Sequence, residues 1–352
     1  MTAAETRRQP DATTAQRAIA RWLFVCCCLV ALILAVCGVT RLTRSGLSIV
    51  EWEPIVGAVP PLAQADWDEL FAEYRESPEY HQVNRGMSLE QFKQIFWWEY
   101  FHRLLGRLIG LAYLLPLLYF AWRGYLRSTP GLGLRLTGVL LLGALQGGVG
   151  WWMVTSGLKD VPQVSHVRLA IHLGLALLIF AAMLWIALGL LQRPPRHPQA
   201  RFACLVAVLV YVQCLAGALV AGTRAGYAYN SFPLMEGRWF PADYFLLDGW
   251  LENALHNMAA VQFHHRGLAW LIVATTILLV ARLLRDQTIS LELRRSAILL
   301  AGLVASQFVL GVVTLLSRVP VELGAAHQVG AVALFACALW LAQKLGGGQV
   351  SA

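Results

Sequence analysis

Apolar residues occur along the chain in eight long runs that are separated by polar or turn-rich segments. A helix needs about 20 mostly apolar residues to cross the hydrocarbon core of a bilayer, and each run is about that long. The pattern therefore predicts an all-α polytopic membrane protein with eight transmembrane helices. The predicted spans are 22–40, 101–121, 136–156, 166–190, 202–222, 263–284, 297–317 and 325–344.

The composition favours a membrane protein over a soluble enzyme. Of the 352 residues, 58% are hydrophobic and 14% are charged, whereas a soluble domain carries about 25% charged residues. A net charge of +8 suggests nucleic acid in a soluble protein. Here the basic residues follow the membrane topology, so lipid is the expected partner and nucleic acid is not. The seven cysteines lie in apolar runs without a CxxC motif, which disfavours zinc ribbons, redox-active thiol pairs and covalently attached haem.

The distribution of Lys and Arg predicts the orientation of the helices. Fifteen of these residues lie on one side of the membrane if the N-terminus is cytoplasmic. The short connections 157–165 and 318–324 on the other side carry only Lys159 and Arg318. Because Lys and Arg accumulate in cytoplasmic loops, both termini are predicted to be cytoplasmic. The first run is too long for a cleavable signal peptide and is followed by no A-x-A site.

The longest outer connection, 42–95, is acidic and is expected to be partly helical. Asp66-x-x-Glu69 is interpreted as an N-cap residue with its N3 partner, which would begin a short helix. Ser88-x-x-Gln91 has the form of a capping box and would begin a helix that runs into the second span.

The second half of the chain repeats the first. The matching signals are Thr40-Arg41 and Thr223-Arg224, Glu99-x-x-His102-Arg103 and Gln262-x-x-His265-Arg266, Gln146 and Gln307, and His172 and His327. Four spans per half is an even number, so both halves point the same way and a pseudo-twofold axis along the membrane normal is expected. The predicted architecture is two four-helix bundles. Its parts are a cytoplasmic tail 1–21, an N-terminal half 22–190, a cytoplasmic linker 191–201, a C-terminal half 202–344 and a cytoplasmic tail 345–352.

Four histidines at equivalent positions predict two binding sites in the outer leaflet. Histidine is costly inside a membrane and is usually functional there. Zinc prefers four ligands, and these spans offer no further Cys, Asp or Glu to complete such a set. Haem needs two axial ligands in an apolar slot. The pairs His102 with His172 and His265 with His327 therefore favour a haem in each half, with structural hydrogen bonding as the alternative.

Arginines and glycines near the histidines agree with a haem site. Arginine pairs with carboxylates such as the haem propionates, and glycine lets a flat ring approach the backbone. The alternatives are anchoring to lipid headgroups and simple helix packing. The propionate candidates are Arg41, Arg103, Arg224 and Arg266, and the glycines are Gly147, Gly148, Gly150 and Gly311.

One position breaks the repeat. Glu99 stands three residues before His102, whereas Gln262 stands three residues before His265, and this spacing places each pair on one helix face. A carboxyl group can move protons or stabilise positive charge, which an amide does poorly. The N-terminal half is therefore the better candidate for catalysis. A Glu99 that merely faces water at the interface is the alternative.

The residues together resemble the haem A synthase family, in its proteobacterial and mitochondrial branch. The resemblance covers nearly the whole chain after residue 22. The motifs that carry it are Gly38-Val-Thr-Arg41-Leu-Thr-Arg44-Ser-Gly46-Leu-Ser, Glu51-Trp-x-Pro54-Ile-x-Gly57, Trp97-Trp-Glu99-Tyr-x-His102-Arg-Leu-Leu-Gly106-Arg, Gln262-Phe-x-His265-Arg and Ala326-His327-Gln. The cysteine pairs that mark the outer loops of the Bacillus-like branch do not occur.

The resemblance implies a substrate, a cofactor and roles for individual residues. His102 and His172 would ligate the substrate haem O, and His265 and His327 would ligate a resident haem b. Glu99 would be the carboxylate that the reaction requires. That reaction converts a methyl group of haem O to a formyl group by successive hydroxylations with oxygen from water. The implied location is a bacterial inner membrane, with the haem sites toward the outer leaflet.

Two other classes of function remain open on the residues alone. A di-haem cytochrome b that exchanges electrons with quinone explains the histidine pairs equally well, and Glu99 with the family motifs argues against it. A transporter is suggested by the internal repeat, but it predicts broken helices with charges at mid-depth, and the spans show neither. The sequence does not identify the electron acceptor, for which a quinone is one candidate. It also leaves open an interaction with haem O synthase and the formation of homo-oligomers. His81, His166, His197 and His256 have no repeat equivalent and are expected to be incidental.

Overall fold

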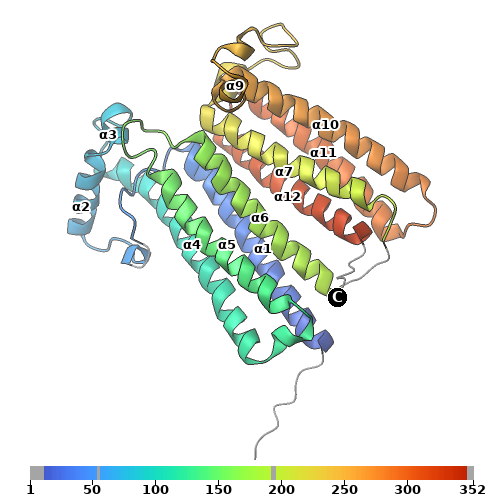
Figure 1. The fold of residues 1–352 in the computed structure, drawn as a ribbon. Coiled ribbons are helices and arrows are strands. Elements are labelled where there is room, and N and C mark those ends of the chain that lie inside the picture. Colours follow the sequence, from blue (N-terminus) through green and yellow to red (C-terminus); the bar gives the residue numbers. More distant parts are fainter. Residues whose placement is uncertain (1–11, 54–55, 192–195, 347–352) are drawn as a thin grey trace, which may run out of the picture.

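A computed structural model describes residues 12–53, 56–191 and 196–346, which are mostly helical. Within these ranges eight helices are long and apolar enough to cross a membrane, which confirms the predicted fold class (Figure 1). The helices are α1 (Ala12–Leu42), α4 (Leu89–Trp122), α5 (Leu132–Val154), α6 (His166–Leu191), α7 (Ala200–Thr223), α10 (Met258–Arg285), α11 (Leu291–Leu316) and α12 (Val321–Gly346).

The eight helices pack as two groups of four. In the N-terminal half α1 packs against α4 and α6, and α5 packs against the same two helices. In the C-terminal half α7 and α11 each pack against α10 and α12. Across the middle, α1 packs on α12, α6 packs on α7, and α6 also contacts α12. Every contact thus has a counterpart in the other half, which is what a pseudo-twofold relation requires. The axis itself stays a prediction.

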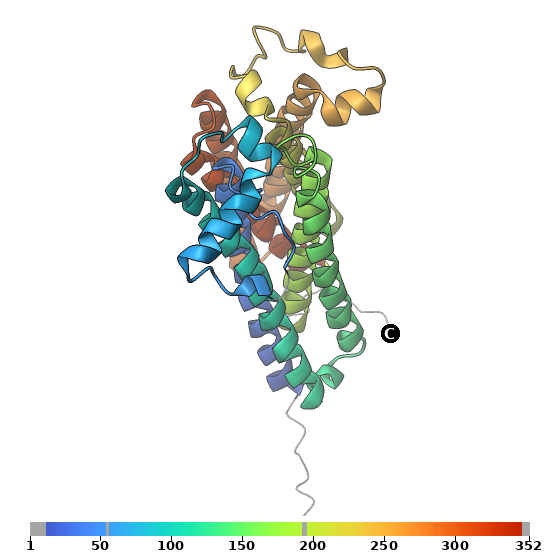
Figure 2. The same cartoon turned by 90° about the vertical axis from the view of Figure 1, so that its left-hand side faces the viewer.

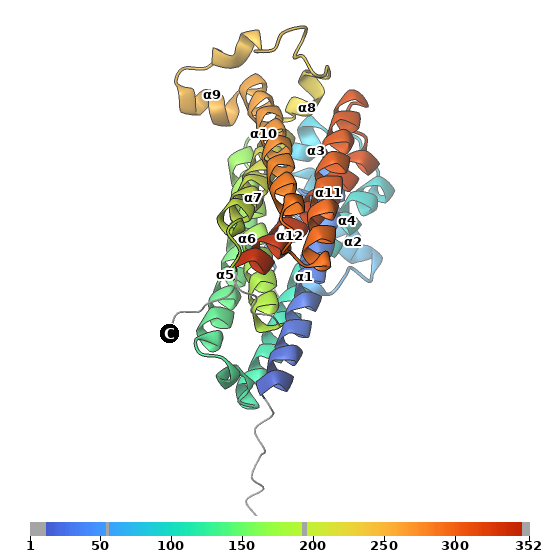
Figure 3. The same ribbon diagram turned by 90° about the vertical axis from the view of Figure 1, so that its right-hand side faces the viewer.

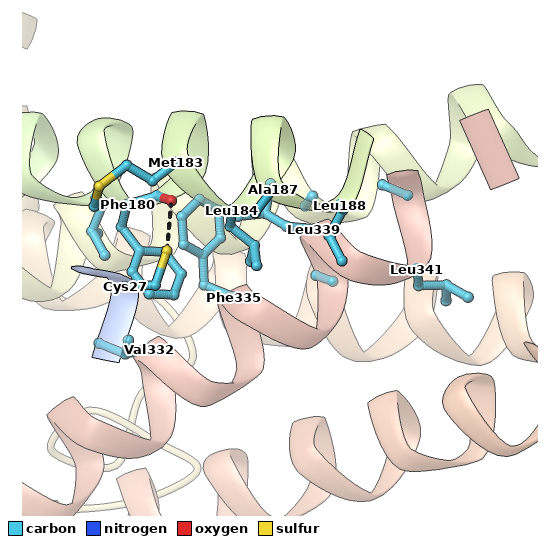
Figure 4. Close-up of a cluster of buried hydrophobic side chains, with 14 of the residues drawn as sticks. Cys27, Phe180, Met183, Leu184, Ala187, Leu188, Val332, Phe335, Leu339 and Leu341 are labelled. Carbon is cyan, nitrogen blue, oxygen red and sulfur yellow. Dashed lines mark hydrogen bonds between the residues drawn. The ribbon is translucent and has the colours of Figure 1, made fainter. Parts of the chain in front are cut away.

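The core of the molecule lies where the two halves meet. Figure 4 shows Cys27 of α1 beside Phe180 of α6 and Phe335 of α12, with the Cys27 thiol donating to the Phe180 carbonyl oxygen at 3.8 Å. The Phe180 and Phe335 rings are 6.4 Å apart. Because lipid is as apolar as these side chains, tight van der Waals packing stabilises such an interface in a membrane.

The two ends of the molecule differ. The start of α1 and the end of α12 lie toward one end (Figures 1 and 3). Two long connections lie toward the other end (Figure 2), and we call residues 43–88 the first outer segment and residues 224–257 the second. The predicted tails 1–21 and 345–352 and linker 191–201 lie partly outside the described residues, as do Arg7, Arg8 and Arg193 of the charge count.

The first outer segment contains η1 (Val56–Ala58), α2 (Gln64–Arg75) and α3 (Pro78–Gln82). The prediction that Asp66 is the N-cap of a helix was wrong, because Ala63 takes that position. Asp66 lies at N3, where its carboxylate accepts the backbone N–H groups of Leu62 and Ala63 at 3.0 and 2.9 Å. The predicted capping box is confirmed: the Ser88 hydroxyl accepts from the Gln91 N–H, and the Gln91 side chain accepts from the Ser88 N–H.

Helix α4 begins twelve residues before the apolar run that predicted it, and its extension anchors the first outer segment. Trp67 and Tyr74 of α2 pack in one buried cluster with Phe92, Phe96 and Tyr100 of α4. Farther along, α4 runs through Pro116 without interruption. The second outer segment contains α8 (Ala225–Ala228), η3 (Ala242–Phe245) and α9 (Trp250–His256), and covers the C-terminal half.

Candidate functional site

Each half brings two of the predicted histidines together near the outer segments. His102 and His172 come from α4 and α6, which lie diagonally because both pack against α1 and α5. His265 and His327 come from α10 and α12, which have the same relation to α7 and α11. All four side chains are half-buried. Within each pair the imidazoles are close enough for the charge of one to act on the other.

Three of the four imidazoles lie against a glutamine amide. The amide nitrogen of Gln146 in α5 is 3.4 Å from Nε2 of His172, and that of Gln307 in α11 is 3.1 Å from Nδ1 of His327. The amide nitrogen of Gln213 in α7 lies 3.2 and 3.3 Å from the two ring nitrogens of His265. In the sequence, Gln146 and Gln307 stand out only as markers of the repeat, and Gln213 carries no such signal.

Glycines one turn after these glutamines make room for the rings. A Cβ at Gly150 would lie 2.9 Å from Cε1 of His172, and one at Gly311 would lie 2.8 Å from Cε1 of His327. Gly150 and Gly311 therefore admit the imidazole itself, which is a different role from the approach of a macrocycle to the backbone. A Cβ at Gly147 or Gly148 would meet no atom within 4 Å.

The histidine pairs fit the axial ligation of a haem. A haem takes two axial donors, and each half presents two neighbouring imidazoles on diagonal helices. In the N-terminal half Nδ1 of His172 is buried without a hydrogen-bond partner, so this ring nitrogen is available to ligate iron. No group of three or more His, Cys, Asp or Glu side chains suited to a metal ion occurs in the described ranges.

Glu99 is buried, with 3% of its surface exposed, and therefore does not merely face water at the interface. Its Oε2 accepts the Ser48 hydroxyl at 2.8 Å and the Ile49 N–H at 2.9 Å. Its Oε1 accepts Nε and an NH2 nitrogen of Arg103 at 3.0 and 2.7 Å. These four donors match the roughly four lone-pair sites of a carboxylate. The arrangement stabilises a negative charge at Glu99.

Arg103 and Arg266 each bind an outer segment. Arg103 donates to the carbonyls of Ile49 and Glu51, both at 2.7 Å. Arg266 donates to the carbonyl of Tyr229 at 3.0 Å and to Oε1 of Gln262. Each arginine thus ties its outer segment to the residue four positions earlier in its own helix. Nε of Arg266 is buried without a partner, so that one N–H remains for a ligand.

The other two propionate candidates lie where the halves meet. Arg41 donates through NH1 to the Ala221 carbonyl of α7 at 2.8 Å and so crosses between the halves. Arg224 has a left-handed backbone conformation with φ of 60°. Burial lowers the pKa of Arg224, and the neighbouring charge of Arg44 lowers it further.

Four histidines outside the pairs form contacts of their own. Nε2 of His166 lies 2.9 Å from Nδ1 of His256, which joins α6 to the second outer segment. His197 pairs with Asp286 at 3.1 Å. The side-chain hydroxyl of Tyr244 lies 2.8 Å from Nε2 of His264, the neighbour of His265. No repeat signal marks these residues, because each joins parts of the chain that differ between the halves.

Glu79 of α3 is a buried carboxyl that the sequence did not single out. Its exposed fraction is 4%. Burial, with a smaller contribution from the charge of Glu99, raises its pKa from an ordinary value of 4.5 to about 7, against the opposing effect of Tyr74, Arg44 and Arg224. A raised pKa means that the folded state holds the proton more tightly, so this group destabilises the fold as the pH rises from about 4.5 to about 7.

We therefore expect Glu79→Gln to stabilise the protein by an amount that grows with pH. The gain should be near zero at pH 4 and reach at most about 3 kcal/mol at pH 8. Thermal unfolding in detergent between these values measures it, with Glu69→Gln on the exposed surface of α2 as the control. A gain independent of pH would contradict the assignment.

Fold and site together define a class: a polytopic helical protein with two four-helix halves and a pair of neighbouring histidines in each. Comparison with known proteins makes the class specific. The family model described as cytochrome oxidase assembly protein (COX15-CtaA) matches residues 20–339. The chain is 52% identical to a haem A synthase of Nitrosospira multiformis, over 94% of each chain. It is 50% identical to one of Nitrosomonas eutropha, over 93% of each, and 44% identical to one of Brucella anthropi, over 94% of this chain and 93% of the relative. The protein belongs to this family of cytochrome oxidase assembly proteins.

Proposed function

We propose that the protein is a haem A synthase, a membrane oxidoreductase that oxidises a methyl group of haem O to a formyl group. The observation that carries the proposal is the presence of a histidine pair in each half of a chain whose relatives bear that name over nearly their whole length. The product would serve the assembly of a terminal oxidase, in keeping with the description of the family.

The two sites would have different tasks. His102 and His172 would hold the iron of the substrate haem O, and His265 and His327 would hold a resident haem b. When bound, haem b would supply a centre that accepts and passes on electrons. Successive hydroxylations with oxygen from water require that electrons and protons leave the methyl carbon, and loss of water from the resulting diol gives the formyl group. The final acceptor of the electrons is outside the protein, and a quinone is our candidate.

Glu99 would act on the substrate through its charge. Its four hydrogen-bond donors favour the ionised carboxylate, and accepting a proton would require that one of these bonds break. A fixed negative charge in a low-dielectric site stabilises positive charge that develops nearby. We therefore assign Glu99 the role of charge stabiliser at the methyl carbon. Gln262, which donates to the Ala225 carbonyl at 2.7 Å, has no such charge in the C-terminal half.

The haem content of the purified protein tests the proposal against a di-haem cytochrome b. Pyridine haemochrome spectra and mass spectrometry should find haem b together with haem O, its alcohol intermediate or haem A. Haem b alone in every preparation would support the electron-transfer class and contradict the proposal. Unbroken spans such as α4 across Pro116 give no support to a transporter.

The predicted sidedness has its own test. We place the protein in a bacterial inner membrane with both termini cytoplasmic, because the basic residues cluster on that side. A reporter fused after Lys344 should give a cytoplasmic signal, and one inserted near Gln64 should give a periplasmic signal. The reverse pattern would move both histidine pairs to the inner leaflet.

A further inference from the structure

Three helices carry the same pair of residues at the same spacing, glutamine followed four positions later by glycine. The pairs are Gln146 with Gly150 in α5, Gln213 with Gly217 in α7, and Gln307 with Gly311 in α11. In each pair the glutamine and the glycine contact the same histidine. We call each pair a glutamine–glycine clamp.

The three clamps share a second contact, although they meet different ring nitrogens. Each amide nitrogen also donates to the backbone carbonyl of its histidine, at 3.1 Å for Gln146, 3.0 Å for Gln213 and 2.7 Å for Gln307. A Cβ at Gly217 would lie 3.3 Å from Cε1 of His265, so the glycine again borders the ring. One helix thus fixes both the backbone and the ring plane of a histidine on its neighbour.

The amide oxygens of the clamps are possible hydrogen-bond acceptors for the imidazole rings. Oε1 of Gln146 and Oε1 of Gln213 are buried without a hydrogen-bond partner. An imidazole that ligates a metal through one nitrogen carries a proton on the other, and an acceptor for that proton fixes the ring and raises its basicity. In the observed rotamer the amide nitrogen faces both the ring and the histidine carbonyl. Rotation of the glutamine side chain would exchange the bond to the carbonyl for a bond from the ring N–H to Oε1, so each clamp can offer this acceptor when its histidine binds iron.

His102 has no clamp. Counted from the Thr-Arg pair at the end of each helix, the residues of α1 that correspond to Gln213 and Gly217 are Val30 and Leu34. Both are buried and apolar. No hydrogen bond to the His102 ring occurs within the described residues. In the C-terminal half both histidines therefore have a glutamine–glycine clamp, whereas in the N-terminal half only His172 has one.

We propose that the three glutamine–glycine clamps are positioning elements that orient and tune the axial histidines, and that unclamped His102 is the ligand that yields when substrate enters or leaves. The inference rests on the proposed haem sites and goes beyond them. It explains chemically why one half retains its haem while the other must exchange substrate for product.

Midpoint potentials of haem b in the purified full-length protein test the clamps. An acceptor at the ring N–H makes the histidine a stronger donor and stabilises ferric iron, so it lowers the potential. We expect Gln213→Leu and Gln307→Leu to raise the potential and Gln213→Glu and Gln307→Glu to lower it, with matching changes in the EPR g values. An amide that only fills space would not shift the potential in opposite directions for the two substitutions.

Gln328→Leu is the matched control. Gln328 adjoins His327 in sequence, but its amide donates to the Leu34 carbonyl at 2.6 Å, so its loss should leave the potential unchanged. Shifts of equal sign or no shifts at Gln213 and Gln307 would overturn the proposal. If a leucine variant releases haem b, the glutamate variant at that position should retain it, and equal loss from both would also overturn it. Absence of haem b from the unmodified protein would instead contradict the proposed function.

Release of haem O to excess apomyoglobin tests the exchangeable ligand. One hydrogen bond contributes about 1 kcal/mol, or about fivefold in rate. Gln146→Leu should speed release by about that factor, and Val30→Gln with Leu34→Gly, which installs a fourth clamp, should slow it similarly. Should the double variant not fold, the single variant Val30→Gln, which offers His102 an amide, decides the role of His102. Unchanged release in the folded variants would contradict the role of His102.

Discussion

Replacing Glu99 with Gln should lower the rate of haem A formation about a hundredfold or more. Removal of a preorganised charge or dipole that stabilises a transition state typically lowers the rate by about this factor. The substitution preserves the shape of the side chain and makes the N-terminal half resemble the C-terminal half at this position. We expect haem O to accumulate, with some alcohol intermediate, while haem b in the C-terminal half remains. Extraction of haems and their separation by mass would measure the outcome.

The structure supplies a control that separates charge from anchoring. Ser48→Ala removes one of the four hydrogen bonds to Glu99 and leaves its carboxylate and Arg103 in place. If Glu99 acts through its charge, Ser48→Ala should retain most of the activity. If Glu99 only attaches the first outer segment to α4, the two variants should lose activity and thermal stability in parallel. Normal haem A formation by Glu99→Gln would refute the assignment outright.

Replacing His265 or His327 with Ala should abolish stable binding of haem b, since either change leaves only one axial donor in the C-terminal half. The low-spin haem b spectrum of the purified protein should disappear, and the melting temperature should fall because the bound cofactor no longer stabilises the folded state. The N-terminal half has its own packed helices and should keep its fold, as circular dichroism would reveal.

His264→Ala is the control for this experiment. His264 directly precedes His265, but its ring hydrogen-bonds with Tyr244 in the second outer segment. Its loss should therefore leave the haem b spectrum largely intact. Full haem b absorbance in both His265→Ala and His327→Ala would remove these residues as ligands.

The membrane-spanning part of the fold could be predicted from the sequence because the bilayer imposes a simple requirement on it. Each helix must be long and apolar, so every apolar run became a helix, and the Ser88 capping box located the beginning of α4. The predicted start of α2 was wrong because a carboxylate such as that of Asp66 is favourable both at the N-cap and in the first turn of a helix. Spacing alone did not distinguish the two positions.

The partners of the site residues were much harder to predict. The histidine pairs stood out through the repeat, and Glu99 through its departure from the repeat. Ser48 and Ile49, which surround Glu99, lie about fifty residues away in a segment of irregular conformation, where no periodicity applies. Gln213 is a single amide in an apolar run and resembles any other packing residue until its helix is placed beside His265.

The contacts between the halves bear on how such a molecule could originate. Helix α1 packs on α12 and α6 packs on α7, so the same pair of elements, the first helix of one half and the last helix of the other, meets twice. A symmetric homodimer of four-helix subunits would show the same pattern of contacts if its two subunits were joined into one chain. In a homodimer any substitution appears in both subunits at once. Fusion after gene duplication removes that constraint, and it lets one copy carry a glutamate where the other carries a glutamine.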